Sequence, residues 1–236
     1  MKQGFFTGCG TALVTPFTKT GIDWENLDRL VEDQLACGVH CLVPVGTTGE
    51  PATMTREERM AVIRRVADKA HGQVPVVAGT GGNNTREVIE EARCARDNGA
   101  NVQLCVTPYY NKTTQAGLIA HYHAIADSGV LPVMVYNVPA RTGLNIAPAT
   151  LQAICRHENV IAVKEANPDV AQAIEKLRLC GEDVAFYSGS DELNWPLMAC
   201  GFQGVISVAS NMLPRAVVEL TEAALQGNVA EAARGS

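Results

Sequence analysis

The stretch Val160-Ile161-Ala162-Val163-Lys164-Glu165-Ala166 decides how the chain folds. It is a short apolar run rich in β-branched residues, which is typical of a strand buried on both faces of a parallel sheet. Lys164 stands at its exit, where apolar neighbours leave the ammonium group little water. Desolvation lowers the pKa of such a lysine and makes the neutral amine available as a nucleophile toward carbonyl groups. The alternative interpretation is an ordinary solvated lysine at a strand end.

Seven other runs of the same kind alternate with helical stretches along the whole chain. The eight expected strands are residues 11–15, 41–45, 74–78, 102–106, 133–136, 161–164, 185–188 and 205–208. Amphipathic spacing predicts helices over 24–36, 56–70 and 86–98, the second opened by a capping box of Thr55 and Glu58. Glycines follow the helical runs where a left-handed helix end is expected, at Gly38, Gly72, Gly99, Gly129, Gly181 and Gly201.

Eight strand–helix units predict an α/β fold, a closed (β/α)8 TIM barrel, with residues 1–236 forming a single domain. A doubly wound open sheet is the alternative. That fold usually has a glycine-rich phosphate loop after its first strand, and Pro16-Phe17-Thr18 is no such loop. One more helix is expected at Pro214–Leu225, followed by a short tail over 226–236 that is either natural or a truncation.

The composition excludes several classes of partner. The chain has 236 residues, of which 47% are hydrophobic, and a net charge of -6 with no basic block, so nucleic acid is not an expected partner. No apolar stretch is long enough to span a bilayer, and the N-terminus lacks the features of a signal peptide. The eight cysteines are scattered without a Cys-x-x-Cys pair, which indicates buried thiols in a reducing cytoplasm.

Polar side chains gather where the expected strands end, which is where a (β/α)8 barrel has its active site. Gly46-Thr47-Thr48-Gly49-Glu50 offers hydroxyls and a pliable backbone as a cradle for a carboxylate or phosphate. The alternative there is a glycine-rich turn with incidental threonines. Tyr136 is a candidate proton donor and Arg141 a candidate carboxylate binder, although a surface arginine is the default. Tyr109 and Tyr110 follow another strand, where packing under a loop is the alternative for at least one of them.

The sequence does not predict a metal-dependent reaction. The five histidines fall in or near expected helices and are interpreted as structural or solvated: His40, His71, His121, His123 and His157. Most acidic residues lie on expected helix faces, which argues against a metal-dependent aldolase. The rim therefore combines a lysine nucleophile, a tyrosine acid/base and two elements that bind carboxylates, and no metal ion is expected there.

These motifs resemble the dihydrodipicolinate synthases (4-hydroxy-tetrahydrodipicolinate synthases), within the N-acetylneuraminate lyase superfamily of class I pyruvate aldolases. The resembling stretches cover essentially the whole chain, in the order Thr15-Pro16-Phe17, 46–50, Ala78-Gly79-Thr80-Gly81, 107–111, 136–143, 163–166, Ser188-Gly189 and 204–207. Within the superfamily, Arg141 resembles the synthases, because sialic acid lyases usually have an apolar residue there.

The resemblance implies a lyase that condenses pyruvate with L-aspartate 4-semialdehyde to give 4-hydroxy-tetrahydrodipicolinate, the first committed step of the diaminopimelate route to lysine. Lys164 would form the Schiff base with pyruvate. Tyr136 would shuttle protons together with Thr47 and with Tyr110, which in the family reaches in from a neighbouring subunit of a homodimer or homotetramer. The substrate-binding residues would be Thr48, Arg141, Ile206 (through its backbone) and Gly189. The resemblance implies no organic cofactor.

Two departures from the family pattern matter. Family members usually continue with about three further helices, and the chain is expected to lack most or all of that C-terminal extension. In feedback-inhibited members, lysine binds at the dimer interface, and a candidate allosteric lysine site matches at Ala52, Asn83, Glu87 and Tyr109. Pro51, Arg56 and Arg59 differ from the sensitive pattern, and the added positive charge of the two arginines is expected to weaken lysine binding.

Two alternative functions stay open from the sequence. One is another pyruvate aldolase of the keto-sugar acid or sialic acid lyase type, which would have no need of Arg141. The other is a catalytically silent barrel with a binding role. Trapping of a pyruvate adduct on Lys164 separates an enzyme from a silent barrel.

Overall fold

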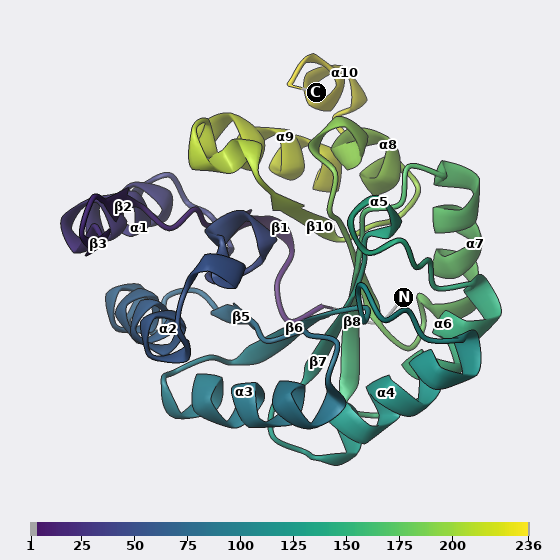
Figure 1. Ribbon diagram of the computed structural model, residues 1–236. Coiled ribbons are helices and arrows are strands. Elements are labelled where there is room, and N and C mark those ends of the chain that lie inside the picture. Colours follow the sequence, from purple (N-terminus) through teal and green to yellow (C-terminus); the bar gives the residue numbers. More distant parts are fainter. Residues whose placement is uncertain (1–3, 236) are drawn as a thin grey trace.

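The computed structural model describes residues 4–235, and in this part of the chain eight parallel strands close into a barrel surrounded by helices (Figure 1). The barrel strands are β1 Gly8–Ala12, β4 Cys41–Val43, β5 Val77–Gly79, β6 Val102–Val106, β7 Val133–Asn137, β8 Val160–Glu165, β9 Ala185–Ser188 and β10 Gly204–Ser207. Their order is β4-β1-β10-β9-β8-β7-β6-β5, and a bridge between Leu42 and Val76 joins the two outer strands of that series. The expected TIM barrel is therefore confirmed.

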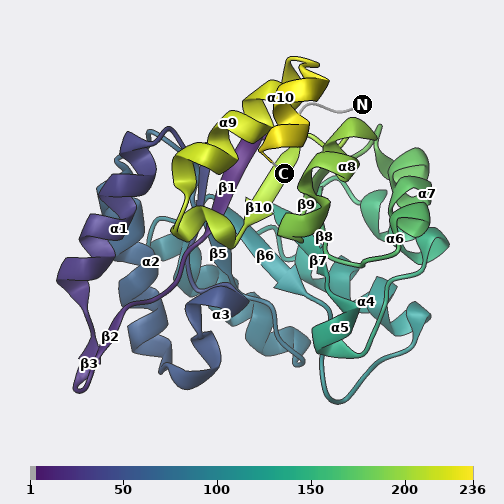
Figure 2. The same cartoon turned by 90° about the horizontal axis from the view of Figure 1, so that it is seen from above.

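Helices follow nearly every barrel strand and cover its outer face (Figure 2). They are α1 Trp24–Ala36, α2 Arg56–Ala70, α3 Thr85–Asp97, α4 Gln115–Asp127, α5 Pro139–Thr142, α6 Pro148–Cys155, α7 Val170–Cys180, α8 Asn194–Ala199, α9 Pro214–Leu225 and α10 Val229–Arg234. Short 3-10 turns lie at η1 Thr47–Gly49, η2 Pro51–Thr53, η3 Asp191–Leu193 and η4 Ala209–Asn211. A small hairpin of β2 Phe17–Thr18 and β3 Gly21–Ile22 stands apart from the barrel. Among the described residues, no helix has the length and apolarity to cross a membrane.

The expected elements mostly have the bounds that the structure shows. Helices 24–36 and 56–70 and strands 102–106 and 185–188 coincide with α1, α2, β6 and β9. The first strand, expected at 11–15, lies at Gly8–Ala12, because it pairs with β10 through Gly8 and Gly10, residues that strand propensity disfavours. Likewise, the strand expected at 74–78 lies at Val77–Gly79.

One expected helix end is wrong. Gly38, Gly72, Gly99, Gly129 and Gly201 have positive φ, as a left-handed helix end requires, whereas Gly181 has a φ of -68°. A Cβ at Gly181 would lie 2.7 Å from the carbonyl oxygen of Leu177, so close packing rather than a left-handed turn accounts for this glycine. The tail expected over 226–236 contains α10, which packs against α9 and buries Ala232 (Figure 2).

Side chains that alternate along each strand build two apolar layers. Inward residues such as Met134 and Ala162 fill the barrel, and outward residues such as Val135 and Val163 pack beneath the helices. At the amino-terminal mouth, the ring of Phe6 stacks on that of Tyr187 with centroids 4.3 Å apart. The Tyr187 hydroxyl donates to the Phe6 carbonyl at 2.7 Å. This packing leaves the polar residues at the opposite, carboxyl ends of the strands.

Candidate active site

A cavity of about 190 Å³ opens at the carboxyl ends of the barrel strands. Its lining comes from five rim segments and comprises Thr47, Thr48, Tyr136, Val138, Ala140, Arg141, Lys164, Ala166, Gly189, Ser190 and Val208. A wider hollow of about 470 Å³ shares Thr47, Val138 and Arg141 with it and extends outward to Arg59 and Tyr109. Six of the residues that the sequence singled out, separated by up to 142 positions along the chain, therefore line one small cavity: Thr47, Thr48, Tyr136, Arg141, Lys164 and Gly189.

Lys164 lies at the exit of β8, in register with Tyr136 on β7 and Tyr187 on β9. Its side chain is only 5% exposed, and its Nζ lies 4.3 Å from the centroid of the Tyr136 ring. Burial lowers the pKa of Lys164 to about 8, the negative charge of Asp191 raises that pKa, and the positive charge of Arg141 lowers it. An appreciable fraction of the amine is therefore uncharged near neutral pH, as a nucleophile requires.

Tyr136 is the ionisable neighbour of that amine. Its ring is 6% exposed, and burial raises the pKa of its hydroxyl, while the charge of Arg141 and a hydrogen bond with Thr47 lower it. The phenol therefore keeps its proton at neutral pH and can donate it to an oxygen in the cavity and later take one back.

Gly189 is required by the close approach of Lys164. A Cβ at this position would lie 2.9 Å from Cε of Lys164 and 3.0 Å from Cβ of Ala166. Both distances are shorter than an ordinary carbon–carbon contact, so any larger residue would displace the lysine. The glycine thus leaves room for the Lys164 side chain, a role that the sequence alone does not reveal.

Thr47 and Thr48 present their side chains from η1, directly after β4. A hydrogen bond of 2.9 Å, which the Gly49 amide donates to the Gly46 carbonyl, stabilises this turn. The Thr15 hydroxyl then donates to the Gly49 carbonyl at 2.8 Å. Two hydroxyls on an ordered turn beside a cationic rim suit a small carboxylate.

Two expected site residues do not line the cavity. The side chain of Ile206 is buried inside the barrel on β10 and is 1% exposed. Tyr110 is 91% exposed, and its backbone has a φ of 67°, unusual for a residue with a side chain. Within this one chain, Tyr110 is separate from Tyr136 and Thr47, and neither cavity includes it.

Three of the four residues of the candidate lysine site lie at the outer hollow or are bonded to a residue that lines it. Ala52 and Tyr109 line the hollow, and the Asn83 amide donates to the Tyr109 carbonyl at 3.2 Å. Glu87 is exposed in the first turn of α3. Ala52, Asn83 and Tyr109 thus lie at or beside the hollow, and the role of the four residues in binding lysine stays a prediction.

Arg56 and Arg59 both form ion pairs with Glu91, at 2.6 and 3.0 Å. Sequence reasoning does not identify Glu91, because it stands 35 and 32 positions away on another helix. The carboxylate offsets part of the positive charge at the hollow. The expected repulsion of a lysine ammonium is therefore weaker than the sequence suggests.

Asp191 is a site residue to which the sequence assigns no role. Its carboxylate accepts from the amides of Val208 and Ala209, both at 2.9 Å, and so ties the exit of β9 to that of β10. The same charge raises the pKa of Lys164. An acidic residue two positions after Gly189 at a strand exit is the signal that could have found it.

The histidines have structural surroundings. His121 is 7% exposed and its Nδ1 is 2.8 Å from the Thr85 hydroxyl, while burial lowers its pKa to about 4. His157 contacts Asp127 at 2.9 Å on the surface. Over residues 4–235, no cluster of three or more His, Cys, Asp or Glu side chains could hold a metal ion.

Comparison with known proteins places these features in a family. Residues 5–235 match the Dihydrodipicolinate synthetase family. A 4-hydroxy-tetrahydrodipicolinate synthase of Geobacter sulfurreducens is 48% identical over 97% of this chain and 79% of its own length. A chloride-inhibited dihydrodipicolinate synthase from Acinetobacter baumannii, solved with pyruvate, is 41% identical with a TM-score of 0.95, over 97% of this chain and 79% of that one. A monomeric dihydrodipicolinate synthase variant has the same TM-score and 41% identity, over 98% of this chain and 78% of that one.

Proposed function

The chain belongs to the dihydrodipicolinate synthetase family, and we propose that Lys164 carries its reaction as a Schiff base with pyruvate. The activity is that of a 4-hydroxy-tetrahydrodipicolinate synthase, a lyase that condenses pyruvate with L-aspartate 4-semialdehyde. One observation supports the assignment of the nucleophile above all others. Lys164 is buried, has a pKa lowered to about 8, and faces a cavity that holds Tyr136 and two threonine hydroxyls.

Pyruvate enters first in this scheme. Thr48 and the backbone at Ile206 hold its carboxylate, while Thr47 is hydrogen-bonded to Tyr136 and joins the proton relay. The neutral amine of Lys164 adds to the keto carbon, and the tyrosine phenol gives a proton to the oxygen as it becomes a hydroxyl. The tyrosinate then takes a proton from the positively charged nitrogen of the adduct and returns it to the hydroxyl, which leaves as water as the C=N bond forms. The cationic imine activates the neighbouring methyl group without a metal or an organic cofactor.

Aspartate semialdehyde enters second, through the outer hollow. Arg141 lies on both cavities and would hold the substrate carboxylate with its planar guanidinium. Loss of a methyl proton gives the enamine, whose carbon attacks the aldehyde, and the new alkoxide takes a proton. The amino group of the semialdehyde then adds to the imine carbon, closes the ring and releases Lys164 as the free amine.

We also propose that the working site needs a second copy of the chain, in a homodimer or homotetramer. Tyr110 is exposed and stands apart from the cavity, which fits a residue that completes the proton relay of a neighbouring subunit. The eight cysteines are free thiols, which suits a reducing compartment such as the cytoplasm.

Borohydride reduction in the presence of pyruvate tests the nucleophile. Reduction of the imine should add one carboxyethyl group to a peptide containing Lys164, and Lys164→Ala should abolish the adduct. An adduct of the same yield in Lys164→Ala would place the chemistry on another lysine. A coupled assay with aspartate semialdehyde then tests the condensation step. A sialic acid or keto-sugar acid aldolase would form the pyruvate adduct but would not react with aspartate semialdehyde.

A further inference from the structure

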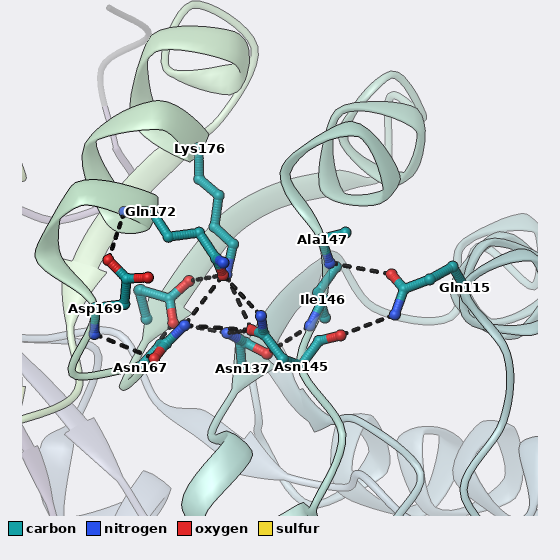
Figure 3. A network of polar contacts seen from close by, with 10 residues as sticks. Gln115, Asn137, Asn145, Ile146, Ala147, Asn167, Asp169, Gln172 and Lys176 are labelled. Atoms are coloured by element: carbon teal, nitrogen blue, oxygen red, sulfur yellow. Dashed lines mark hydrogen bonds and ion pairs between the residues drawn. The ribbon is translucent and has the colours of Figure 1, made fainter.

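A buried network of polar side chains lies directly behind the strand that carries the nucleophile (Figure 3). Because successive strand residues point to opposite faces, Lys164 faces the cavity and Glu165 faces the helices. The Glu165 carboxylate and the Lys176 ammonium of α7 form an ion pair at 2.8 Å, and both side chains are fully buried. Removing two charges from water costs free energy, so a buried ion pair contributes little net stability to the fold. The presence of this pair therefore needs another explanation.

The two carboxylate oxygens of Glu165 have different partners. One accepts from Lys176, and the other accepts from the side-chain amide of Asn137 at 2.8 Å and from the backbone amide of Asn167 at 2.9 Å. Asn137 is the last residue of β7, directly after Tyr136. A single carboxylate therefore ties together the exits of the two strands that carry Lys164 and Tyr136.

Asn137 also closes a loop. Its amide nitrogen donates to the side-chain oxygen of Asn145 at 2.9 Å, and its own side-chain oxygen accepts from the Ile146 amide at 3.0 Å. The segment 138–144 between these anchors carries Val138, Ala140 and Arg141, all of which line the cavity.

Asn145, the second anchor, is held from three further directions. Its amide donates to Gln172 at 2.7 Å, its side-chain oxygen lies 3.4 Å from the Lys176 ammonium, and its backbone carbonyl accepts from Gln115 at 2.9 Å. Figure 3 shows these side chains converging from α4, α7 and the two strand exits. Both ends of the segment are thus fixed, while Arg141 in its middle is exposed.

We propose that Glu165 and Lys176 act through Asn137 and Asn145 as positioning residues that hold the Arg141 segment against the cavity and set the affinity for the second substrate. The inference rests on the proposed role of Arg141. Charge-assisted hydrogen bonds in a dry environment are shorter and stronger than amide–amide bonds, so the ion pair can fix the loop anchors where two asparagines alone would not. Neither member of the pair touches the cavity.

Kinetics of two variants test the proposal, one breaking the ion pair and one breaking the loop anchor. In Lys176→Met and in Asn145→Ala, we expect the KM for aspartate semialdehyde to rise roughly tenfold, as loss of orientation commonly costs. The yield of the pyruvate adduct on Lys164 should stay that of the parent. Because Lys176→Met leaves a carboxylate buried and unpaired, the double variant Glu165→Gln/Lys176→Met, which removes both charges, is measured if the single variant fails to fold. Its KM should rise as well.

Hydrogen exchange of the segment 138–144 supplies a readout that does not depend on substrate. Exchange there should become faster in the network variants. The matched control is Arg178→Met, which removes an exposed ion pair with Glu175 on the same helix and should change neither exchange nor KM.

Two results would overturn the inference. One is unchanged exchange over 138–144 in the folded network variants. The other is faster exchange together with a parental KM, which would make the network structural only. Arg141→Ala is the reference for the proposed function: if its KM for aspartate semialdehyde does not rise, the role of Arg141 itself is wrong, whatever the network variants show.

Discussion

Under the proposed mechanism, burial of Lys164 determines the pH at which the site can react, because only the uncharged amine attacks a carbonyl. The pKa of this lysine falls from the ordinary value of 10.5 to about 8, mainly through the loss of water around the ammonium. Two neighbouring charges then shift this pKa in opposite directions. Arg141 lowers the pKa and Asp191 raises it, so the residue proposed to bind the second substrate also favours the free amine.

The first prediction concerns pH. The rate of pyruvate adduct formation should rise with pH and level off above about 8, because the protonated amine is inactive below that pKa. Arg141→Ala should move the midpoint upward and Asp191→Asn downward, since each removes one of the two opposing charges. Borohydride quenching at a series of pH values measures the midpoint. A midpoint that stays in place in both variants would show that these charges do not act on Lys164.

The second prediction concerns the space beside the nucleophile. Gly189→Ala would place a methyl group 2.9 Å from Cε of Lys164, so we expect slower adduct formation and a loss of about 1–3 kcal/mol in the free energy of unfolding. Gly82→Ala is the control, because its new Cβ would lie at an ordinary 3.5 Å from Val88. Quenched-flow trapping and chemical denaturation measure the two effects. Equal adduct rates in both variants would contradict the steric role of Gly189.

At the scale of elements, local composition explains why most of the barrel could be predicted. The β-branched run of β8 favours a buried strand over any other structure in a soluble chain. The helix over 56–70 begins at a capping box that can be seen in the sequence. The predicted position of β1 is three residues too far along the chain. Pairing with β10 brings Gly8 and Gly10 into the strand, although glycine disfavours strands. Strand exits were predictable as the site because parallel strands bring their carboxyl ends together.

The buried network could not be predicted in this way. Glu165 and Lys176 are 11 positions apart, one on a strand and the other on a helix. From the sequence alone, each would be interpreted as a charged side chain in contact with water. Only the packing of α7 on β8 reveals that they share one dry site. The same holds for Glu91, whose two arginine partners come from another helix.

The third prediction concerns the start of α2. The Thr55 hydroxyl accepts from the Glu58 amide at 3.2 Å, and the Glu58 carboxylate accepts from the Thr55 amide at 2.8 Å. Thr55→Ala should therefore lower the free energy of unfolding by about 1 kcal/mol without changing turnover. Thr55→Ser keeps the hydroxyl and should restore stability. Denaturant titration checks both, and equal losses in the two variants would show that the hydroxyl does not cap the helix.

At the scale of the whole molecule, Tyr110 is the residue that a single chain does not explain. It is almost fully exposed on a strained backbone and does not line the cavity where the proposed relay would place its hydroxyl. If the proposed relay is right, a barrel that supplies all eleven residues of the inner cavity from its own rim would still depend on a second copy for its proton relay. Catalysis and assembly would then be linked through one side chain.

The fourth prediction tests that link by complementation. Tyr110→Phe should lower turnover substantially and leave the fold intact, and Lys164→Ala should be inactive. When the two variants are mixed and allowed to exchange subunits, activity should return, because a mixed dimer has one site with both an intact lysine and an intact tyrosine. A steady-state assay before and after mixing measures the recovery. Full activity of Tyr110→Phe, or of a monomeric parent preparation, would contradict the shared relay.

The stack of Phe6 on Tyr187 fills the amino-terminal mouth, and this has a consequence for traffic through the site. In the part of the chain that the structure describes, both site cavities open at the opposite, carboxyl ends of the strands. Under the proposed function, pyruvate in the inner cavity would have to bind before the larger aldehyde occupies the outer hollow. The water released by imine formation would then leave through the same hollow. The order in which substrates bind and water leaves would therefore depend on the Phe6–Tyr187 stack as well as on the chemistry.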